Sequence, residues 1–300
     1  MQTQNKLKIA FFGTPDFSVQ VLNRLEAGGI IPDLIITNPD EPTGRKLIIT
    51  PPPVKIWATT KNIPVIQPEN LKTIPIELEQ DFDLFIVVAY GKIIPESILN
   101  LPKHGTLNVH PSLLPKYRGP SPIQTAILNG DNETGVSIML LDKEMDHGPT
   151  IAQEKITLID WNPYSEELRS RLAIIAGNLL KKIIPDWIGG KVKAIPQDHS
   201  LATFTKKIAK DDGYINPNLL LSDGRGVDNE SEMAWRKIRA LNPDPGAYTV
   251  VEAKNGQKTR IKIIRAKFEN NKLTIEKVIP EGKKEMGWED WKRGNIIEKN

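Results

Sequence analysis

The chain has 300 residues, and its 40 lysines and arginines against 37 aspartates and glutamates give a formal net charge of +3. This length is enough for two domains with buried cores. Because cysteine is absent, disulfide bonds and thiolate metal sites are excluded, and four scattered histidines give no ligand cluster, so we expect no metal.

The first elements follow the order of a parallel sheet. The apolar run at 8–12 predicts a buried strand, residues 15–27 a helix with Thr14 as its cap, and residues 34–37 a second strand. This order indicates the right-handed parallel unit that begins a doubly wound sheet. No G-x-G-x-x-G pattern surrounds Gly13, so a dinucleotide site is not supported. The first apolar run is also too short for a signal peptide or a membrane span, and we expect a cytoplasmic protein with no membrane partner.

Residues 38–53 are polar and rich in proline and glycine, which predicts a long exposed loop with no element of its own. The most apolar run of the chain, at 84–89, predicts a central parallel strand. The other elements expected in this half are helices at 54–61, 121–129 and 164–184 and strands at 65–66, 106–110, 133–141 and 150–156.

The strand at 106–110 places two reactive side chains together. Alternation along a strand puts Asn108 and His110 on one face and the apolar residues between them on the other. Pro111 ends the strand, so the pair lies at a carboxyl end, where open α/β sheets bind ligands. The alternative is a pair of satisfied polar residues at a strand end.

Residues 189–205 are polar, carry two glycines and a proline, and lack periodicity, which predicts a linker between a domain at 1–188 and another at 206–300. In the second domain a helix at 232–241 precedes strands at 248–251, 259–266 and 272–275, separated by short Asn-containing turns. We expect a small, OB-like β-barrel after a Rossmann-like α/β domain.

Charge is distributed unevenly between the two parts. Residues 201–300 hold 20 basic and 15 acidic residues, a net +5, which leaves −2 for residues 1–200. The surplus indicates either a polyanionic partner or a solvated surface. Lys258, Arg260 and Lys262 share one strand face, which suits phosphate contacts or solubilising edge charges. We expect core packing for Trp235, Trp288 and Trp291, and the alternative is that they stack on the bases of a single-stranded nucleic acid.

Two blocks of sequence carry a family resemblance. The segment Asn108-Val-His-Pro-Ser-Leu-Leu-Pro-Lys-Tyr-Arg-Gly119, followed by Leu141-Asp-Lys-Glu-Met-Asp-His-Gly-Pro149, resembles the signature of the folate-dependent formyltransferases. The resemblance implies a formyl transfer from 10-formyltetrahydrofolate to an amine, with Asn108, His110 and Asp146 as the catalytic triad. It implies folate binding by Gly91, Lys92, Ile93, Ile94, Ser112, Leu113, Leu114, Pro115 and Asp142. For Ile93 and Ile94 core packing is the alternative, and we expect His147 to be an exposed polar residue.

The blocks Phe12-Gly-Thr-Pro-Asp-Phe17, Asn38-Pro-Asp-Glu-Pro-Thr-Gly-Arg45 and Val87-Val-Ala-Tyr-Gly-Lys-Ile-Ile-Pro95 are similar to the branch of this family that acts on methionyl initiator tRNA in translation initiation. This similarity implies contacts to tRNA from Arg45, Lys46, Lys206, Lys207 and Lys210. A helix would place Lys207 and Lys210 on one face, and a solvated helix face is the alternative. We expect the protein to act as a monomer.

The triad suits amine formylation. Asn108 would donate to the formyl oxygen, His110 would add a donor or shuttle protons, and Asp146 would orient His110 and accept the proton of the amine. The order of these proton transfers stays open. The rival acceptors are a sugar-nucleotide amine or glycinamide ribonucleotide, and a rival of another class is a catalytically silent RNA-binding protein.

Overall fold

The computed structural model describes residues 6–44, 47–221, 226, 229–254 and 256–296. The chain divides into two compact units, and neither is one continuous stretch of sequence. The first unit comprises Met1–Gly119, Thr134–Ile156 and Arg169–Phe204, and the second comprises Pro120–Glu133, Thr157–Leu168 and Thr205–Asn300. None of the described helices combines the length and the apolar composition needed to cross a bilayer.

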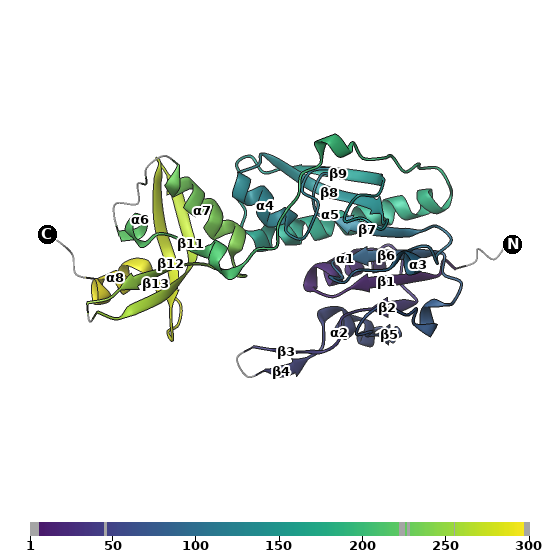
Figure 1. Ribbon diagram of the computed structural model, residues 1–300, viewed down its shortest axis with the longest axis horizontal. Helices are drawn as coiled ribbons and strands as arrows, with labels where there is room; N and C mark the ends of the chain where they lie inside the picture. Colours follow the sequence, from purple (N-terminus) through teal and green to yellow (C-terminus); the bar gives the residue numbers. More distant parts are fainter. Residues whose placement is uncertain (1–5, 45–46, 222–225, 227–228, 255, 297–300) are drawn as a thin grey trace. The chain divides into compact units, whose positions relative to one another are not determined.

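The first unit is built on a seven-stranded sheet in the order β5-β2-β1-β6-β7-β8-β9 (Figure 1). Strands β5 to β7 of this order run parallel, and β8 pairs antiparallel with β7. The chain order reverses between β1 and β6, which is the switch point of a doubly wound sheet. The bounds are β1 (Ile9–Gly13), β2 (Leu34–Ile36), β5 (Val65–Ile66), β6 (Leu84–Val88), β7 (Thr106–His110), β8 (Glu133–Leu140) and β9 (Thr150–Thr157).

The central strands are apolar along their whole length because they are covered on both faces. Every residue of β1 and β6 is buried, and Phe85 packs its ring 5.4 Å from those of Phe12 and Phe82. Helix α5 approaches α1 closely at Gly177, where a Cβ atom would lie 2.4 Å from Cβ of Arg24. The helices that carry residues of this unit are α1 (Asp16–Glu26), α2 (Pro53–Thr60), α3 (Glu96–Leu99) and α5 (Ser165–Ile188), with 3-10 turns η1 (Ile76–Leu78) and η2 (His199–Leu201).

Two local predictions for this unit are wrong. Helix α1 starts at Asp16 with Pro15 as its cap residue, and the Thr14 hydroxyl instead donates to the Tyr90 carbonyl oxygen at 3.3 Å. The segment 38–53 is not free of elements, since β3 (Glu41–Thr43) pairs antiparallel with β4 (Ile48–Thr50). The polar composition of the segment predicts a loop. However, Ile48 and Ile49 are β-branched and form β4, although each is 62% exposed.

The second unit joins helices to an antiparallel sheet of four strands in the order β10-β11-β12-β13. Ile261 and Ile263 of β11 are buried, whereas Lys258 and Arg260 are exposed, so the predicted alternation of this strand is confirmed. Trp288 and Trp291 lie in the core, as predicted, and Trp235 packs against it partly buried. The elements are α4 (Pro122–Asn129), η3 (Lys210–Gly213), α6 (Pro217–Leu221), α7 (Glu230–Leu241), β10 (Ala247–Glu252), β11 (Lys258–Glu269), β12 (Lys272–Pro280), β13 (Met286–Gly287) and α8 (Trp288–Asn295).

The predicted fold class, a Rossmann-like sheet followed by a small β domain, is therefore confirmed.

Removing the ring of Phe85 tests the central packing. Phe85→Ala is expected to lower the free energy of unfolding by about 3–5 kcal/mol, because it deletes a fully buried ring between two others. Urea denaturation followed by circular dichroism measures the change. The control Ile76→Ala, at a side chain that is 75% exposed, is expected to stay within about 0.5 kcal/mol of wild type. A loss below about 1 kcal/mol for Phe85→Ala would contradict this account of the core.

Candidate active site

Strand β7 presents Asn108 and His110 on one face, as the alternation predicts. The strand lies inside the sheet, where the Cα of Asn108 is in register with Val87 of β6 and Met139 of β8. His110 is buried, while Asn108 is partly exposed. Among the described residues no hydrogen bond engages the Asn108 side chain. Its amide is therefore available to a ligand at the end of the sheet.

The imidazole of His110 meets Asp146 from the loop between β8 and β9. The distance from His110 Nδ1 to Asp146 Oδ1 is 3.4 Å, and both side chains are largely buried. On the other side of the ring, Nε2 lies 2.8 Å from the Tyr117 carbonyl oxygen. A carbonyl oxygen only accepts, so Nε2 carries a hydrogen and Nδ1 is the nitrogen free to gain one. The pair is thus arranged to hold a proton between Nδ1 and the carboxylate.

Three residues around this pair adopt backbone conformations that side chains disfavour. Ala89 follows β6 with φ +49°, Tyr117 has φ +63° and Asp146 has φ +50°. Such conformations cost about 1–3 kcal/mol each and persist where the surroundings enforce them. The conformation of Tyr117 directs its carbonyl oxygen at His110, and the Asp146 carboxylate accepts a hydrogen bond of 2.7 Å from the Gly119 amide. Two of these residues, Tyr117 and Asp146, belong to the two loops that meet at the imidazole of His110.

The loop after β7, residues 112–115, is fixed by a buried serine. Ser137 of β8 donates its hydroxyl to the Ser112 carbonyl oxygen at 2.6 Å and accepts from the Leu114 amide at 3.0 Å. The Ser112 hydroxyl donates to the Lys116 carbonyl oxygen at 2.5 Å. The predicted folate residues of this loop therefore lie directly after the triad strand in a rigid segment.

The predicted folate residues after β6 differ in their surroundings. Ile93 is 92% exposed, so the core alternative is wrong for it, while Ile94 packs partly buried against the aromatic core. Lys92 donates its ammonium group to the carbonyl oxygens of residues 68 and 69 at 2.9 and 3.0 Å. Gly91 has φ +81°, which turns the chain away from the strand.

The prediction that His147 is an exposed polar residue is wrong. Its Nδ1 lies 2.7 Å from a carboxylate oxygen of Asp142, and its ring stacks on that of His199 at 4.1 Å with an interplanar angle of 4°. Only about a third of its side chain is exposed. The partner ring belongs to His199, 52 residues further along the chain, and local sequence patterns do not reveal such a contact.

The predicted tRNA residues fall in two groups. Arg45 and Lys46 lie outside the residues that the structure describes. Lys206, Lys207 and Lys210 belong to the second unit, where Lys206 forms an ion pair with Asp212 at 3.0 Å. The predicted helical face is wrong, because residues 205–209 form no helix and the turn η3 begins only at Lys210.

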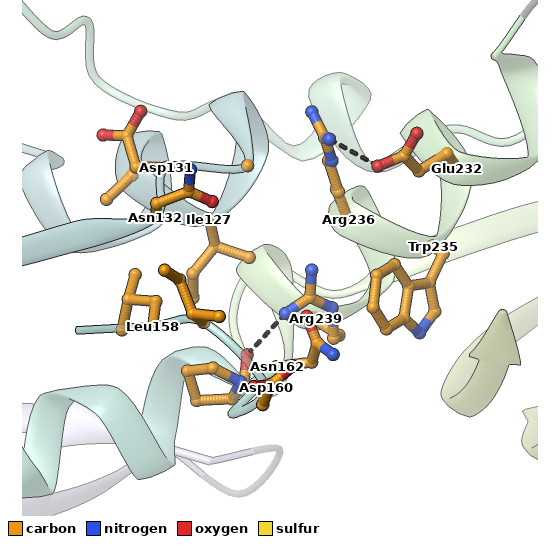
Figure 2. Close-up of a pocket in the computed structure, with 14 residues that line it drawn as sticks. Ile127, Asp131, Asn132, Leu158, Asp160, Asn162, Glu232, Trp235, Arg236 and Arg239 are labelled. Carbon is orange, nitrogen blue, oxygen red and sulfur yellow. Dashed lines mark hydrogen bonds and ion pairs between the residues drawn. The ribbon is translucent and has the colours of Figure 1, made fainter.

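Within the second unit, a cavity of about 300 Å³ contains none of the predicted site residues (Figure 2). Its notable group is Arg239, which is 5% exposed and lies with its guanidinium carbon 3.8 Å from the centre of the Trp235 ring. Arg239 Nη1 donates to the Pro163 carbonyl oxygen at 3.3 Å, but its Nε finds no hydrogen-bond partner among the described residues. Burial lowers the pKa of Arg239 to about 10. Nearby Arg236 is paired with Glu232.

Comparison with known families gives two matches along the chain. The description "Formyl transferase" matches residues 7–184, and "Formyl transferase, C-terminal domain" matches residues 228–274. The first match covers the strand and the loop that carry Asn108, His110 and Asp146.

Individual proteins extend the similarity over nearly the whole chain. A methionyl-tRNA formyltransferase of Staphylococcus epidermidis is 38% identical over 96% of this chain and 96% of its own. That of Halalkalibacterium halodurans is 42% identical over 83% of this chain and 76% of its own. Among solved structures, an N-formyltransferase of Helicobacter canadensis, in complex with folinic acid and dTDP-3-aminofucose, superposes with a TM-score of 0.62. It is 20% identical and covers 88% of this chain and 89% of its own, which shows a shared fold alone.

Arg239 offers a test of the buried cation. Because burial depresses its pKa in the folded state, the charge destabilises the fold at every pH below about 10, and stability rises as pH passes through that value. The shift from 12.5 to about 10 corresponds to roughly 3 kcal/mol, which the contact with Trp235 offsets by about 1–2 kcal/mol. Arg239→Met is therefore expected to raise the free energy of unfolding by about 1 kcal/mol at pH 7 in urea denaturation.

The matched control is Arg236→Met, at a half-buried arginine paired with Glu232, which is expected to be neutral or to lose up to about 1 kcal/mol. A loss of more than about 1 kcal/mol for Arg239→Met would show that its contacts outweigh the penalty of burial.

Proposed function

The chain belongs to the formyl transferase family, among the methionyl-tRNA formyltransferases, and we propose that Asn108, His110 and Asp146 carry out its reaction. The protein is a transferase that formylates methionyl initiator tRNA for translation initiation, with a folate-derived formyl donor. The observation that carries the proposed triad is the 3.4 Å approach of His110 Nδ1 to Asp146, beside the unengaged amide of Asn108 on the same strand.

The donor in this proposal is 10-formyltetrahydrofolate. The loops after β6 and β7 would bind it at the switch-point edge of the sheet, where doubly wound folds take their ligands. The residues assigned to this role are Gly91, Lys92, Ile93, Ile94, Ser112, Leu113, Leu114, Pro115 and Asp142. Exposed Ile93 supports the assignment, because burial against a pterin or benzoyl ring would give an apolar side chain a partner that it lacks among the described residues.

In the reaction, the amine nitrogen of methionine attacks the formyl carbon, and the bond from that carbon to N10 of the folate breaks. Asn108 donates its amide N–H to the formyl oxygen, which becomes negative in the tetrahedral intermediate. The attacking amine loses a proton to the His110 and Asp146 pair, and the departing N10 gains one. Since Tyr117 occupies Nε2, the proton is held at Nδ1 facing Asp146.

The tRNA would be bound by basic groups outside the triad. We assign this role to Arg45, Lys46, Lys206, Lys207 and Lys210, and to residues 206–300 as the tRNA-binding domain, joined by a linker at 189–205 to a catalytic domain at 1–188. The exposed lysine and arginine residues of β11 support a polyanionic partner. As its acceptor is a tRNA of translation initiation, we place the protein in the cytoplasm and propose that it acts as a monomer.

The choice of acceptor is tested by transfer of labelled formyl groups from 10-formyltetrahydrofolate. We expect transfer to methionyl initiator tRNA and none to glycinamide ribonucleotide or an amino-sugar nucleotide present in the same reaction, because the family relatives at about 40% identity act on the tRNA. Transfer to the sugar nucleotide alone would overturn the acceptor while leaving the fold and the triad in place. A chain that binds the tRNA with no transfer would be a silent RNA-binding protein.

The triad is tested by two substitutions measured in steady-state kinetics. Asn108→Ala is expected to lower kcat by about 10²–10³, because it removes a donor to the developing oxyanion. Asp146→Asn keeps the shape of the side chain but removes the charge that holds the proton on His110, and a loss of about 10²–10⁴ is expected.

Asn100→Ala, at an exposed asparagine that ends α3, serves as the control for these substitutions and is expected to retain wild-type kcat. Near wild-type turnover in Asn108→Ala or Asp146→Asn would sink the assignment.

A further inference from the structure

Gln197 lies in the predicted linker, yet its side chain is 7% exposed and fully hydrogen-bonded. Its Nε2 group donates to the carbonyl oxygens of Asp146 and Gly148, at 2.9 and 2.7 Å. Its Oε1 atom accepts from Nε and Nη2 of Arg118, at 3.2 and 2.7 Å. A primary amide has two N–H donors and two lone pairs, so this side chain has no remaining capacity. It clasps the backbone on both sides of His147.

Arg118 fixes which way the Gln197 amide points. A guanidinium group only donates, so it holds the amide oxygen toward itself and turns the NH₂ group toward the Asp146 loop. Arg118 is 4% exposed and also donates to His199 Nδ1 at 2.8 Å. The orientation of Gln197 is therefore set by a buried cation and not by solvent.

The segment that carries Gln197 is attached to both loops of the candidate site. Ile195 exchanges two backbone hydrogen bonds with Thr150, at 2.7 and 2.9 Å, just beyond the Asp146 loop. At its other end, Thr203 accepts from the Arg118 amide with its carbonyl oxygen at 2.8 Å and from the Tyr117 amide with its hydroxyl at 2.9 Å. Residues 195–203, which we call the strap, thus link the loop that supplies Asp146 to the loop that supplies the Tyr117 carbonyl.

The strap also contacts the side-chain face of the Asp146 loop. His199 stacks on His147, which is tied through Nδ1 to Asp142 at the start of that loop. The stacking and the Asp142 contact support a loop in which Asp146 adopts a left-handed φ of +50°, a conformation uncommon for residues other than glycine.

We propose that Gln197 is a positioning residue for formyl transfer: it holds the backbone at Asp146 so that the carboxylate faces His110 Nδ1. The proposal rests on the proposed triad and assigns to the strap a part in catalysis. Gln197 touches no reacting atom. Its loss lets the backbone at residues 146–148 relax, which separates the carboxylate from the imidazole while substrate contacts on β6 and β7 remain.

Two variants of Gln197 test this role in the full-length protein. Gln197→Met keeps the length of the side chain and removes all four hydrogen bonds. Gln197→Glu retains partners for Arg118 but sets a carboxylate oxygen against the carbonyl oxygens of Asp146 and Gly148. Both are expected to lower kcat by about 10- to 100-fold, with KM for the tRNA and the folate within about two-fold of wild type.

Lys193→Ala is the control. Lys193 precedes the strap in the same segment, is exposed, and has no side-chain hydrogen bond among the described residues. We expect kcat within about two-fold of wild type for this variant. Hydrogen exchange gives an independent measurement, since the amides of residues 146–148 are expected to exchange faster in both Gln197 variants and not in the control.

Wild-type kcat and wild-type exchange of the loop in both Gln197 variants, with Asp146→Asn inactive, would overturn the positioning role and leave the proposed function intact. Activity of Asp146→Asn itself would mean that the triad is wrong. A loss of kcat accompanied by equally faster exchange throughout β1, β6 and β7 would also overturn the proposal, because it would reveal a general loss of stability.

Discussion

The contact between His110 and Asp146 requires that two loops be held against each other. One follows β7 and the other follows β8, and because these strands are antiparallel, the loops begin at opposite ends of the pair. His110 is placed by β7, whose apolar residues are locked inside the sheet, so its position follows from the core. Asp146 has no such support from its own strand. Its carboxylate is placed by the Gly119 amide, by the hydrogen bonds of Gln197 to the loop backbone and by a left-handed backbone conformation at Asp146. The position of His110 is thus determined by packing, and that of Asp146 by directional hydrogen bonds.

That difference explains what could be predicted from the sequence. The central strands were predictable because continuous apolar runs and period-two alternation follow from burial, and β7 has the predicted bounds of 106–110. Asn108 and His110 on one face follow from the same alternation, and Asp146 from the family resemblance. Gln197 was not predictable, because its partners lie about 50 and 80 residues away and its surroundings read as a polar linker. Hydrogen bonds between side chains far apart in the chain produce no periodic pattern in the sequence.

The wrong predictions have equally specific causes. Strand β4 is not evident from the sequence, because the polar, proline-rich composition of residues 38–53 favours a loop despite two adjacent isoleucines. The shared face of Lys207 and Lys210 requires a helix that residues 205–209 do not form, since the first turn after them, η3, begins at Lys210. The contacts of His147 are not evident from the sequence, because stacking on His199 brings together two segments that no local pattern connects. In each case a tertiary contact or a competing propensity decided the outcome.

In this proposal the catalytic unit includes the strap, which follows α5 in the chain. Two buried arginines of this protein have different surroundings. Arg239 lies on the indole of Trp235, with its Nε unengaged among the described residues, whereas Arg118 directs donors at the Gln197 oxygen and at an imidazole nitrogen. The buried guanidinium of Arg118 orients the neutral amide of Gln197, and that amide in turn holds the backbone of the Asp146 loop. A unit that stopped at the end of α5 would keep the sheet, Asn108, His110 and the Gly119 amide, but would lose Gln197, which holds the backbone at Asp146. The residues that form the site therefore extend beyond α5, to the segment whose hydrogen bonds hold the Asp146 loop.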